Sequence, residues 1–244
     1  MAHYQQLKFV ENFSKIFFQN KKITILEIGS WDVNGTLRSY FNNVENYIGL
    51  DLEKGPGVDI VYDGEKFPLK EMWGKIDLSI SCECFEHNPF YLKNFHQMIN
   101  CTNSDGVVLF TCATIGRHEH GTTATNPDHS PASAKIFDYY KNLKPSNFKT
   151  IIKKNLFYKH KFYKNDVSKD LYFLGIKSKK YIDDFNKFDR LILSQNTLIK
   201  SLNINLILQI KSFIKYLLIN IFPFIIGDFL VRKIRNFLMR NWKK

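Results

Sequence analysis

Residues 23–35 read ITILEIGSWDVNG, and this stretch decides the fold. Its first six residues are a run of β-branched and apolar side chains, which is typical of a strand buried on both faces. Gly29 follows directly, and a glycine at the end of a buried strand lets the backbone approach a ligand closely. The stretch therefore predicts the first strand of an α/β domain, with a binding loop at its carboxyl end.

The residues that follow alternate short apolar runs with helical stretches. Helices are predicted at 35–41 and 91–98, and Asp105-Gly106 is predicted to form a turn. Further strands are predicted at 47–50, 58–62, 76–81 and 107–112. This alternation predicts a mainly parallel sheet with helices on both faces.

Beyond the fifth strand the sequence changes character twice. Residues 113–133 are polar and too long for an ordinary connection, which indicates a functional loop. Strands predicted near 156–163 and 171–176 would form a closing antiparallel hairpin. We therefore expect a globular domain over residues 1–180 and a separate tail over 181–244.

Acidic side chains follow four of the predicted strands. They are Glu27, Asp51, Asp63 and Glu83. In an open α/β sheet the ligand binds at the carboxyl ends of the strands, so these groups should meet at one site. A carboxylate at the end of the second strand, Asp51, is suited to accept hydrogen bonds from both hydroxyls of a ribose.

The first loop does not match a phosphate site. A dinucleotide-binding turn has the pattern G-x-G-x-x-G, whereas Trp31 and Asp32 stand here where small residues are needed. An acidic group would repel a pyrophosphate. S-adenosylmethionine (SAM) is a nucleoside with a cationic sulfonium and no phosphate, so it suits an acidic site better.

Four segments in order, LEIGSWDVNG, YIGLDL, VDIVYDGEKFP and IDLSISCECFEHNPF, resemble the motifs of class I SAM-dependent methyltransferases. The similarity spans about residues 22–177 and is closest to methyltransferase-11-type proteins encoded in surface-polysaccharide clusters. It implies a Rossmann-like three-layer sandwich and SAM as the cofactor. The cofactor-binding residues that it implies are Glu27, Gly29, Ser30, Asp51, Leu52, Asp63, Gly64, Cys82 and Glu83.

Two further groups are candidates for the chemistry of the methyl acceptor. His87, just after the fourth strand, is predicted to face the transferred methyl group and to act as a general base. Packing under the acceptor pocket or capping a helix is the alternative for this side chain. In and beyond the long loop, the predicted acceptor-binding residues are His118, His120, Tyr139 and Tyr140. No metal site is predicted; a divalent ion held by His118, Glu119 and His120 is the alternative.

The net charge of +12 is concentrated in the tail. Residues 191–244 contain nine basic residues and one acidic residue, Asp228, and therefore carry +8. Apolar residues recur every three or four positions over 198–221 and again over 229–244, which predicts C-terminal amphipathic helices. We expect them to lie on an anionic membrane surface; docking on the domain or dimerisation is the alternative. The apolar run 216–231 is too short to span a bilayer.

These observations predict a SAM-dependent methyltransferase that acts on a small or lipid-linked saccharide at oxygen. The four cysteines lie within the predicted domain and indicate a reduced, cytoplasmic compartment, with association to the inner face of the membrane through the tail. One alternative is an RNA methyltransferase with a basic RNA-binding tail, although nucleic acid is not expected because the tail's apolar residues form continuous faces. The other is a non-catalytic SAM-binding scaffold. The sequence does not indicate an oligomeric state.

Overall fold

The computed structural model describes residues 3–67, 70–153 and 155–201, together with residues 213, 214, 216, 217 and 233. Seven strands form one sheet in the order β3-β2-β1-β4-β5-β7-β6. Strands β1 to β5 are parallel to one another, while β7 runs antiparallel to both β5 and β6. The expected Rossmann-like sandwich with a closing antiparallel hairpin is confirmed.

The strands fall where the apolar runs predict them, with different ends. Their bounds are β1 (Ile23–Ile28), β2 (Val44–Asp51), β3 (Ile60–Val61), β4 (Ile76–Cys82), β5 (Thr102–Ala113), β6 (Lys159–Asn165) and β7 (Asp170–Ile176). The predicted turn at Asp105-Gly106 is wrong, because both residues lie inside β5. A register shift between Ile76 and Leu78 accompanies this early start of β5 beside β4.

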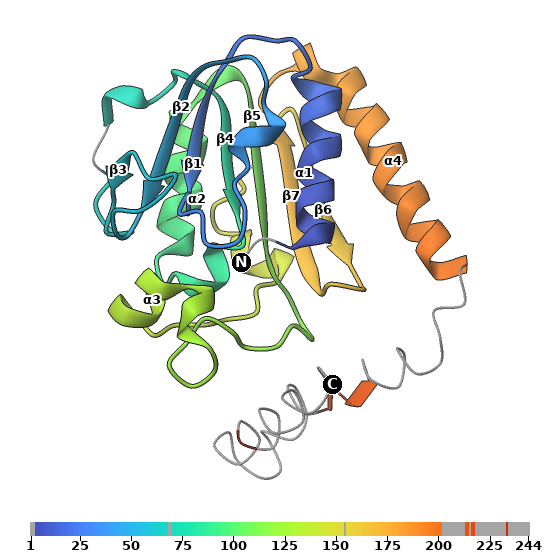
Figure 1. Cartoon of the computed structure of the whole chain (residues 1–244). Coiled ribbons are helices and arrows are strands. Elements are labelled where there is room, and N and C mark those ends of the chain that lie inside the picture. The colour runs from blue at the N-terminus through green and yellow to red at the C-terminus, as the bar shows by residue number, and fades with distance from the viewer. Residues whose placement is uncertain are drawn as a thin grey trace.

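Helices cover both faces of the sheet. Helices α1 (Tyr4–Phe17) and α4 (Ile182–Ser201) lie side by side on one face, and α2 (Tyr91–Cys101) lies on the other (Figure 1). The short helix α3 (Pro131–Ile136) lies beyond the carboxyl ends of the strands (Figure 1). The predicted helix at 35–41 is wrong, since only a single 3₁₀ turn forms, at Arg38–Tyr40.

Each face of the sheet has its own apolar core, and β5 contributes to both. Val107 and Leu109 pack with α1 and α4, whereas Val108 and Phe110 pack with α2. This alternation follows from the two-residue period of a strand. It explains why β5 reads as a continuous apolar run.

Helix α4 begins just after the predicted end of the domain at Lys180. Its side chains Phe185, Phe188 and Ile192 are buried in the same core as Phe9 and Phe13 of α1. The packed unit therefore extends past Lys180 to at least Ile192. Most of the predicted amphipathic helices, at 198–221 and 229–244, lie outside the described residues. Within the part of the chain that the structure describes, no helix is both long and apolar enough to cross a bilayer.

Candidate cofactor site

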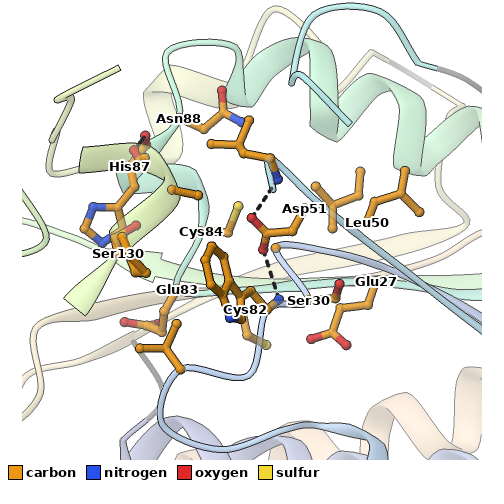
Figure 2. A pocket seen from close by; sticks show the side chains of 18 of the residues that line it. Glu27, Ser30, Leu50, Asp51, Cys82, Glu83, Cys84, His87, Asn88 and Ser130 are labelled. Carbon is orange, nitrogen blue, oxygen red and sulfur yellow. Dashed lines mark hydrogen bonds between the residues drawn. The ribbon is translucent and has the colours of Figure 1, made fainter. Parts of the chain in front are cut away.

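A pocket opens at the carboxyl edge of the sheet, where the loops after β1, β2 and β4 meet. It is open to solvent and is lined by residues of these loops together with residues 129–133. Asp51 projects into it between the end where Glu27 lies and the end where His87 and Ser130 lie (Figure 2). Helix α1 also reaches the pocket, through Gln6.

The pocket brings together eight of the nine predicted cofactor-binding residues. These are Glu27, Gly29, Ser30, Asp51, Leu52, Gly64, Cys82 and Glu83. Asp63 is the exception, because its exposed carboxylate accepts hydrogen bonds from the main-chain amides of Glu65 and Lys66, at 2.9 and 2.8 Å. These bonds lower the pKa of Asp63, and the side chain shapes the turn without lining the pocket.

The loop after β1 is fixed by main-chain contacts with β2. The amides of Gly29 and Ser30 both donate to the carbonyl of Leu50, at 2.8 and 3.1 Å. Gly29 has a φ of +84°, and a Cβ atom there would lie 2.5 Å from Cβ of Cys84. Only glycine meets both requirements, so the residue that ends the first strand is fixed by local geometry.

Glu27 and Asp51 are acidic groups held in a buried setting. Burial raises the pKa of Glu27 to about 7, although Tyr47 donates a hydrogen bond to its carboxylate at 2.5 Å. Burial likewise raises the pKa of Asp51, against the effect of the amides of Trp31 and Leu52, which donate to it. Both groups would gain from a nearby positive charge, which favours the ionised form.

Glu83 belongs to an ion-pair network that sequence reasoning missed. His3 lies 3.5 Å from Glu83 and 3.0 Å from Asp170, and Arg117 lies 3.3 Å from Asp170. Burial alone would raise the pKa of Glu83, but His3 and Arg117 outweigh it and hold the pKa at about 2. No sequence pattern indicates this network, because its four residues lie on four separate segments of the chain.

The charge of the pocket is one-sided. Among the described residues that line it there are three carboxylates, Glu27, Asp51 and Glu83, and no lysine or arginine. The first turn also lacks a helix that could present its N-terminus to a phosphate, because only the 3₁₀ turn at Arg38–Tyr40 follows. This site is therefore suited to a cationic ligand and poorly suited to a pyrophosphate.

None of the four predicted acceptor-binding residues lines the pocket, whereas the predicted base does. His87 lines the pocket, and its Nε2 lies 3.3 Å from Nε2 of His120. His118 and His120 are buried, and Tyr140 donates to the carbonyl of His118 at 2.8 Å. Tyr139 is half-buried and does not line the pocket.

The pocket wall opposite Asp51 comes from residues that were not among the predicted site residues. Asn88 follows His87, and residues 129–133 enter from the long loop and the start of α3. Ser133 donates its hydroxyl to the carbonyl of His87 at 2.5 Å, which ties the two segments together. The loop was predicted to be functional. Which of its residues face the pocket depends on how it packs against the segment of His87, and no local sequence pattern indicates that packing.

Burial dominates the electrostatics of the segment after β4. It raises the pKa of Glu86 to about 8, with the charge of Glu83 adding to the effect. It lowers the pKa of His120 to about 3 and that of His87 well below its ordinary value. Both imidazoles are therefore neutral at pH 7.

No family model and no curated protein matches the chain. Solved structures of similar fold include the CurJ carbon methyltransferase, at 14% identity and a TM-score of 0.45, with 65% of this chain and 49% of that chain covered. The plantazolicin methyltransferase BpumL in complex with SAH is 12% identical at a TM-score of 0.47, covering 71% and 83%. YcgJ from Bacillus subtilis is 13% identical at a TM-score of 0.47, covering 66% and 71%. At these values the case for function comes from the residues of the site itself.

Proposed function

We propose that the chain is a SAM-dependent methyltransferase. The observation that supports this most strongly is the pocket at the strand ends, with its three carboxylates and no lysine or arginine among the described residues that line it. SAM supplies a methyl group bound to a positively charged sulfur, and its amino group is a second cation. An acidic pocket stabilises both charges, whereas it would repel a nicotinamide dinucleotide.

Each lining residue has a proposed task. Asp51 binds the ribose, because each carboxylate oxygen keeps a lone pair beyond the one that a main-chain amide occupies. Glu27, Gly29 and Ser30 surround the methionine part, together with Cys82 and Glu83. Leu52 and Gly64 flank the adenine.

The proposed acceptor is a hydroxylated molecule, a small or lipid-linked saccharide of surface-polysaccharide biosynthesis that is methylated at oxygen. Asn88, His129 and Ser130 give the far end of the pocket a polar lining, which fits hydroxyl groups. His87 is the proposed base through Nδ1, which has no hydrogen-bond partner among the described residues. Under this proposal His118, His120 and Tyr140 hold the wall in place rather than touch the acceptor.

The location of the enzyme is proposed from charge alone. Residues 191–244 carry +8 on two segments with an apolar repeat, which supports a cytoplasmic enzyme that binds the anionic inner face of a membrane through this tail. Flotation of the full chain with vesicles tests this. Binding to anionic vesicles and not to zwitterionic ones supports the proposal, and equal behaviour with both contradicts it.

Titration calorimetry with SAM, S-adenosylhomocysteine and NAD⁺ tests the cofactor. We expect SAM and S-adenosylhomocysteine to bind at one site per chain and NAD⁺ not to bind. Transfer of labelled methyl from SAM to a panel of mono- and oligosaccharides then tests the acceptor. If SAM does not bind, the proposed function is wrong as a whole; if it binds and no saccharide is labelled, only the acceptor is wrong.

A further inference from the structure

Glu86, His87 and His120 form a buried cluster behind the pocket wall. One ligand atom from each, a carboxylate oxygen and two ring nitrogens, lies within 4.8 Å of the others. Glu86 is 0% exposed, and neither of its oxygens has a hydrogen-bond partner on another described residue. A buried carboxylate without partners is costly, so an interaction that compensates for its burial is expected here.

The hydrogen bond between His120 and a backbone carbonyl determines which of its ring nitrogens carries the hydrogen. Its Nδ1 lies 2.9 Å from the carbonyl oxygen of His118, and an imidazole can meet a carbonyl only by donating. Nδ1 therefore carries the hydrogen, and Nε2 accepts a hydrogen bond from Nε2 of His87, whose hydrogen a metal ion would replace. This is the arrangement of metal-binding histidines, whose second nitrogen donates to a backbone carbonyl.

Aromatic packing holds the two imidazoles in place. The rings of His87 and His120 are nearly perpendicular, at 84°, with centroids 4.8 Å apart. Tyr140 packs against both rings, with centroids at 5.4 and 5.0 Å. Its hydroxyl donates to the same His118 carbonyl that orients His120. The sites of both Nε2 atoms are thus fixed by neighbours outside the cluster.

The spacing of the two nitrogens matches a metal ion. They are 3.3 Å apart, and two Zn–N bonds of about 2.05 Å at a tetrahedral angle place their nitrogens roughly 3.3 Å apart. The carboxylate oxygen of Glu86 lies within 4.8 Å of a ring nitrogen of each histidine, so it has to move closer to complete such a set.

We propose that Glu86, His87 and His120 bind one divalent transition-metal ion, with Zn²⁺ as the reference metal. Two imidazoles and one carboxylate are a donor set that zinc and its neighbours accept, with a fourth position left open. Because His87 also lines the pocket, an ion bound by this cluster would lie next to the pocket wall. The second described cluster, His3 with Glu83 and Asp170, is a poorer site, because Arg117 already pairs with Asp170.

This inference goes beyond the proposed function and does not rest on it, because the ion would bind whether or not the chain transfers methyl groups. If the proposed function is also correct, His87 serves as a metal ligand and the ion takes over the activation of the acceptor. A metal on Nε2 requires the hydrogen on Nδ1, so His87 cannot then act as a base. The ion would instead lower the pKa of an acceptor hydroxyl at the open position.

Metal binding by the full chain tests the proposal directly. After removal of any histidine tag and treatment with a chelator, Zn²⁺ is titrated in competition with a chromophoric chelator. We expect one Zn²⁺ per chain. Glu86→Gln and His120→Gln should each weaken binding about tenfold or more. The matched control is His96→Gln, an exposed histidine of α2 outside the cluster, which should leave binding unchanged.

Substitution with Co²⁺ reports which types of atom bind the metal, without relying on the variants. Nitrogen and oxygen ligands in a tetrahedral site give visible d–d absorption and no sulfur-to-metal charge-transfer band, whereas binding at Cys82 or Cys84 would add such a band. The proposal is overturned if the wild-type chain binds no metal, if the charge-transfer band appears, or if folded Glu86→Gln and His120→Gln both bind like the wild type. Circular dichroism shows which variants are folded. If neither variant is folded, the metal content and the Co²⁺ absorption spectrum of the wild-type chain are the test.

Discussion

The carboxylate of Asp51, at the end of β2, accepts a hydrogen bond at 3.0 Å from the main-chain amide of Trp31, twenty residues earlier in the chain. Its other oxygen accepts from the amide of Leu52 at 2.7 Å. One side chain therefore holds the loop after β1 against the loop after β2 (Figure 2). The proposed ribose contact and the shape of the first loop depend on the same carboxylate.

Asp51→Ala should weaken SAM binding by about 10- to 100-fold, because it removes hydrogen bonds to a charged acceptor. Calorimetry with SAM measures the change, and thermal unfolding reports how much of it is loss of the folded state. Asp51→Asn keeps one side-chain oxygen, so its SAM affinity should lie between those of the wild type and Asp51→Ala.

The matched control for this change is Asp63→Ala. Asp63 also follows a strand in the sequence, but its side chain is exposed and lies off the pocket. Its loss should leave SAM affinity within about twofold of the wild type. Equal losses in the two alanine variants would mean that Asp51 has no special role.

The pH dependence of SAM binding should follow Glu27. Burial raises its pKa to about 7, so the carboxylate ionises as the pH rises through neutrality. A cation is bound best by the ionised form, and affinity should therefore increase between pH 6 and pH 8.

Tyr47→Phe sharpens this test. The tyrosine hydroxyl donates to the Glu27 carboxylate at 2.5 Å and stabilises its ionised form. Without that bond the pKa of Glu27 should rise further, and the midpoint of the affinity profile should move to higher pH. A midpoint that stays in place would separate SAM binding from the ionisation of Glu27.

The sheet could be predicted from the sequence because each strand carries its own signal. The continuous apolar run of β5 is local, and so are the acidic residues at or just beyond the ends of β1 to β4. The same locality explains the errors. Asp105-Gly106 has the composition of a turn, but it lies in an irregular part of β5, where the register with β4 passes from Ile76–Thr102 to Leu78–Val107. The predicted helix at 35–41 reduces to one 3₁₀ turn.

The candidate site was predictable on the strand side and not on the opposite side. Gly29 and Asp51 follow strands directly, so topology alone brings them to one edge. Gln6, Ser130 and the partners of His120 reach the site through long-range packing of α1 and of the loop before α3. The pairing of His87 with His120 spans 33 residues, and no spacing rule indicates it.

Stability should fall as the pH rises through 9, because of His3. Burial alone would lower its pKa, but hydrogen bonds to Asp170 and Glu83 outweigh burial and raise it to about 9. A group with a raised pKa in the folded state contributes stability that is complete below about pH 6.5 and lost as the pH approaches 9.

Urea unfolding at several pH values measures this loss, which should be on the order of 1–3 kcal/mol. His3→Gln cannot take up a proton, so its stability should change much less over the same range. Parallel curves for the two proteins would contradict the role of His3 in the ion-pair network.

Ser30→Ala should separate binding from stability. The Ser30 hydroxyl is buried, lines the pocket and has no partner among the described residues. Removing an unsatisfied buried hydroxyl should leave the free energy of unfolding unchanged or raise it by up to about 1 kcal/mol. If the hydroxyl binds the cofactor, SAM affinity should fall by about 3- to 10-fold. Losses in both quantities would mean that Ser30 serves the fold.

Gly29→Ala should destabilise the protein by about 2–4 kcal/mol, since two costs add. An alanine at φ +84° is strained, and its Cβ would lie 2.5 Å from Cβ and 2.7 Å from Sγ of Cys84. Gly74→Ala is the matched control, because Gly74 has a φ of +73° but nothing within 4 Å of the added atom. That variant should lose only about 1 kcal/mol, the cost of the backbone conformation. Denaturant unfolding of both variants measures the difference, which isolates the contact with Cys84. Equal losses would mean that the loop after β1 moves away from Cys84 at no cost, and that the pocket is less rigid at Gly29 than its hydrogen bonds to Leu50 imply.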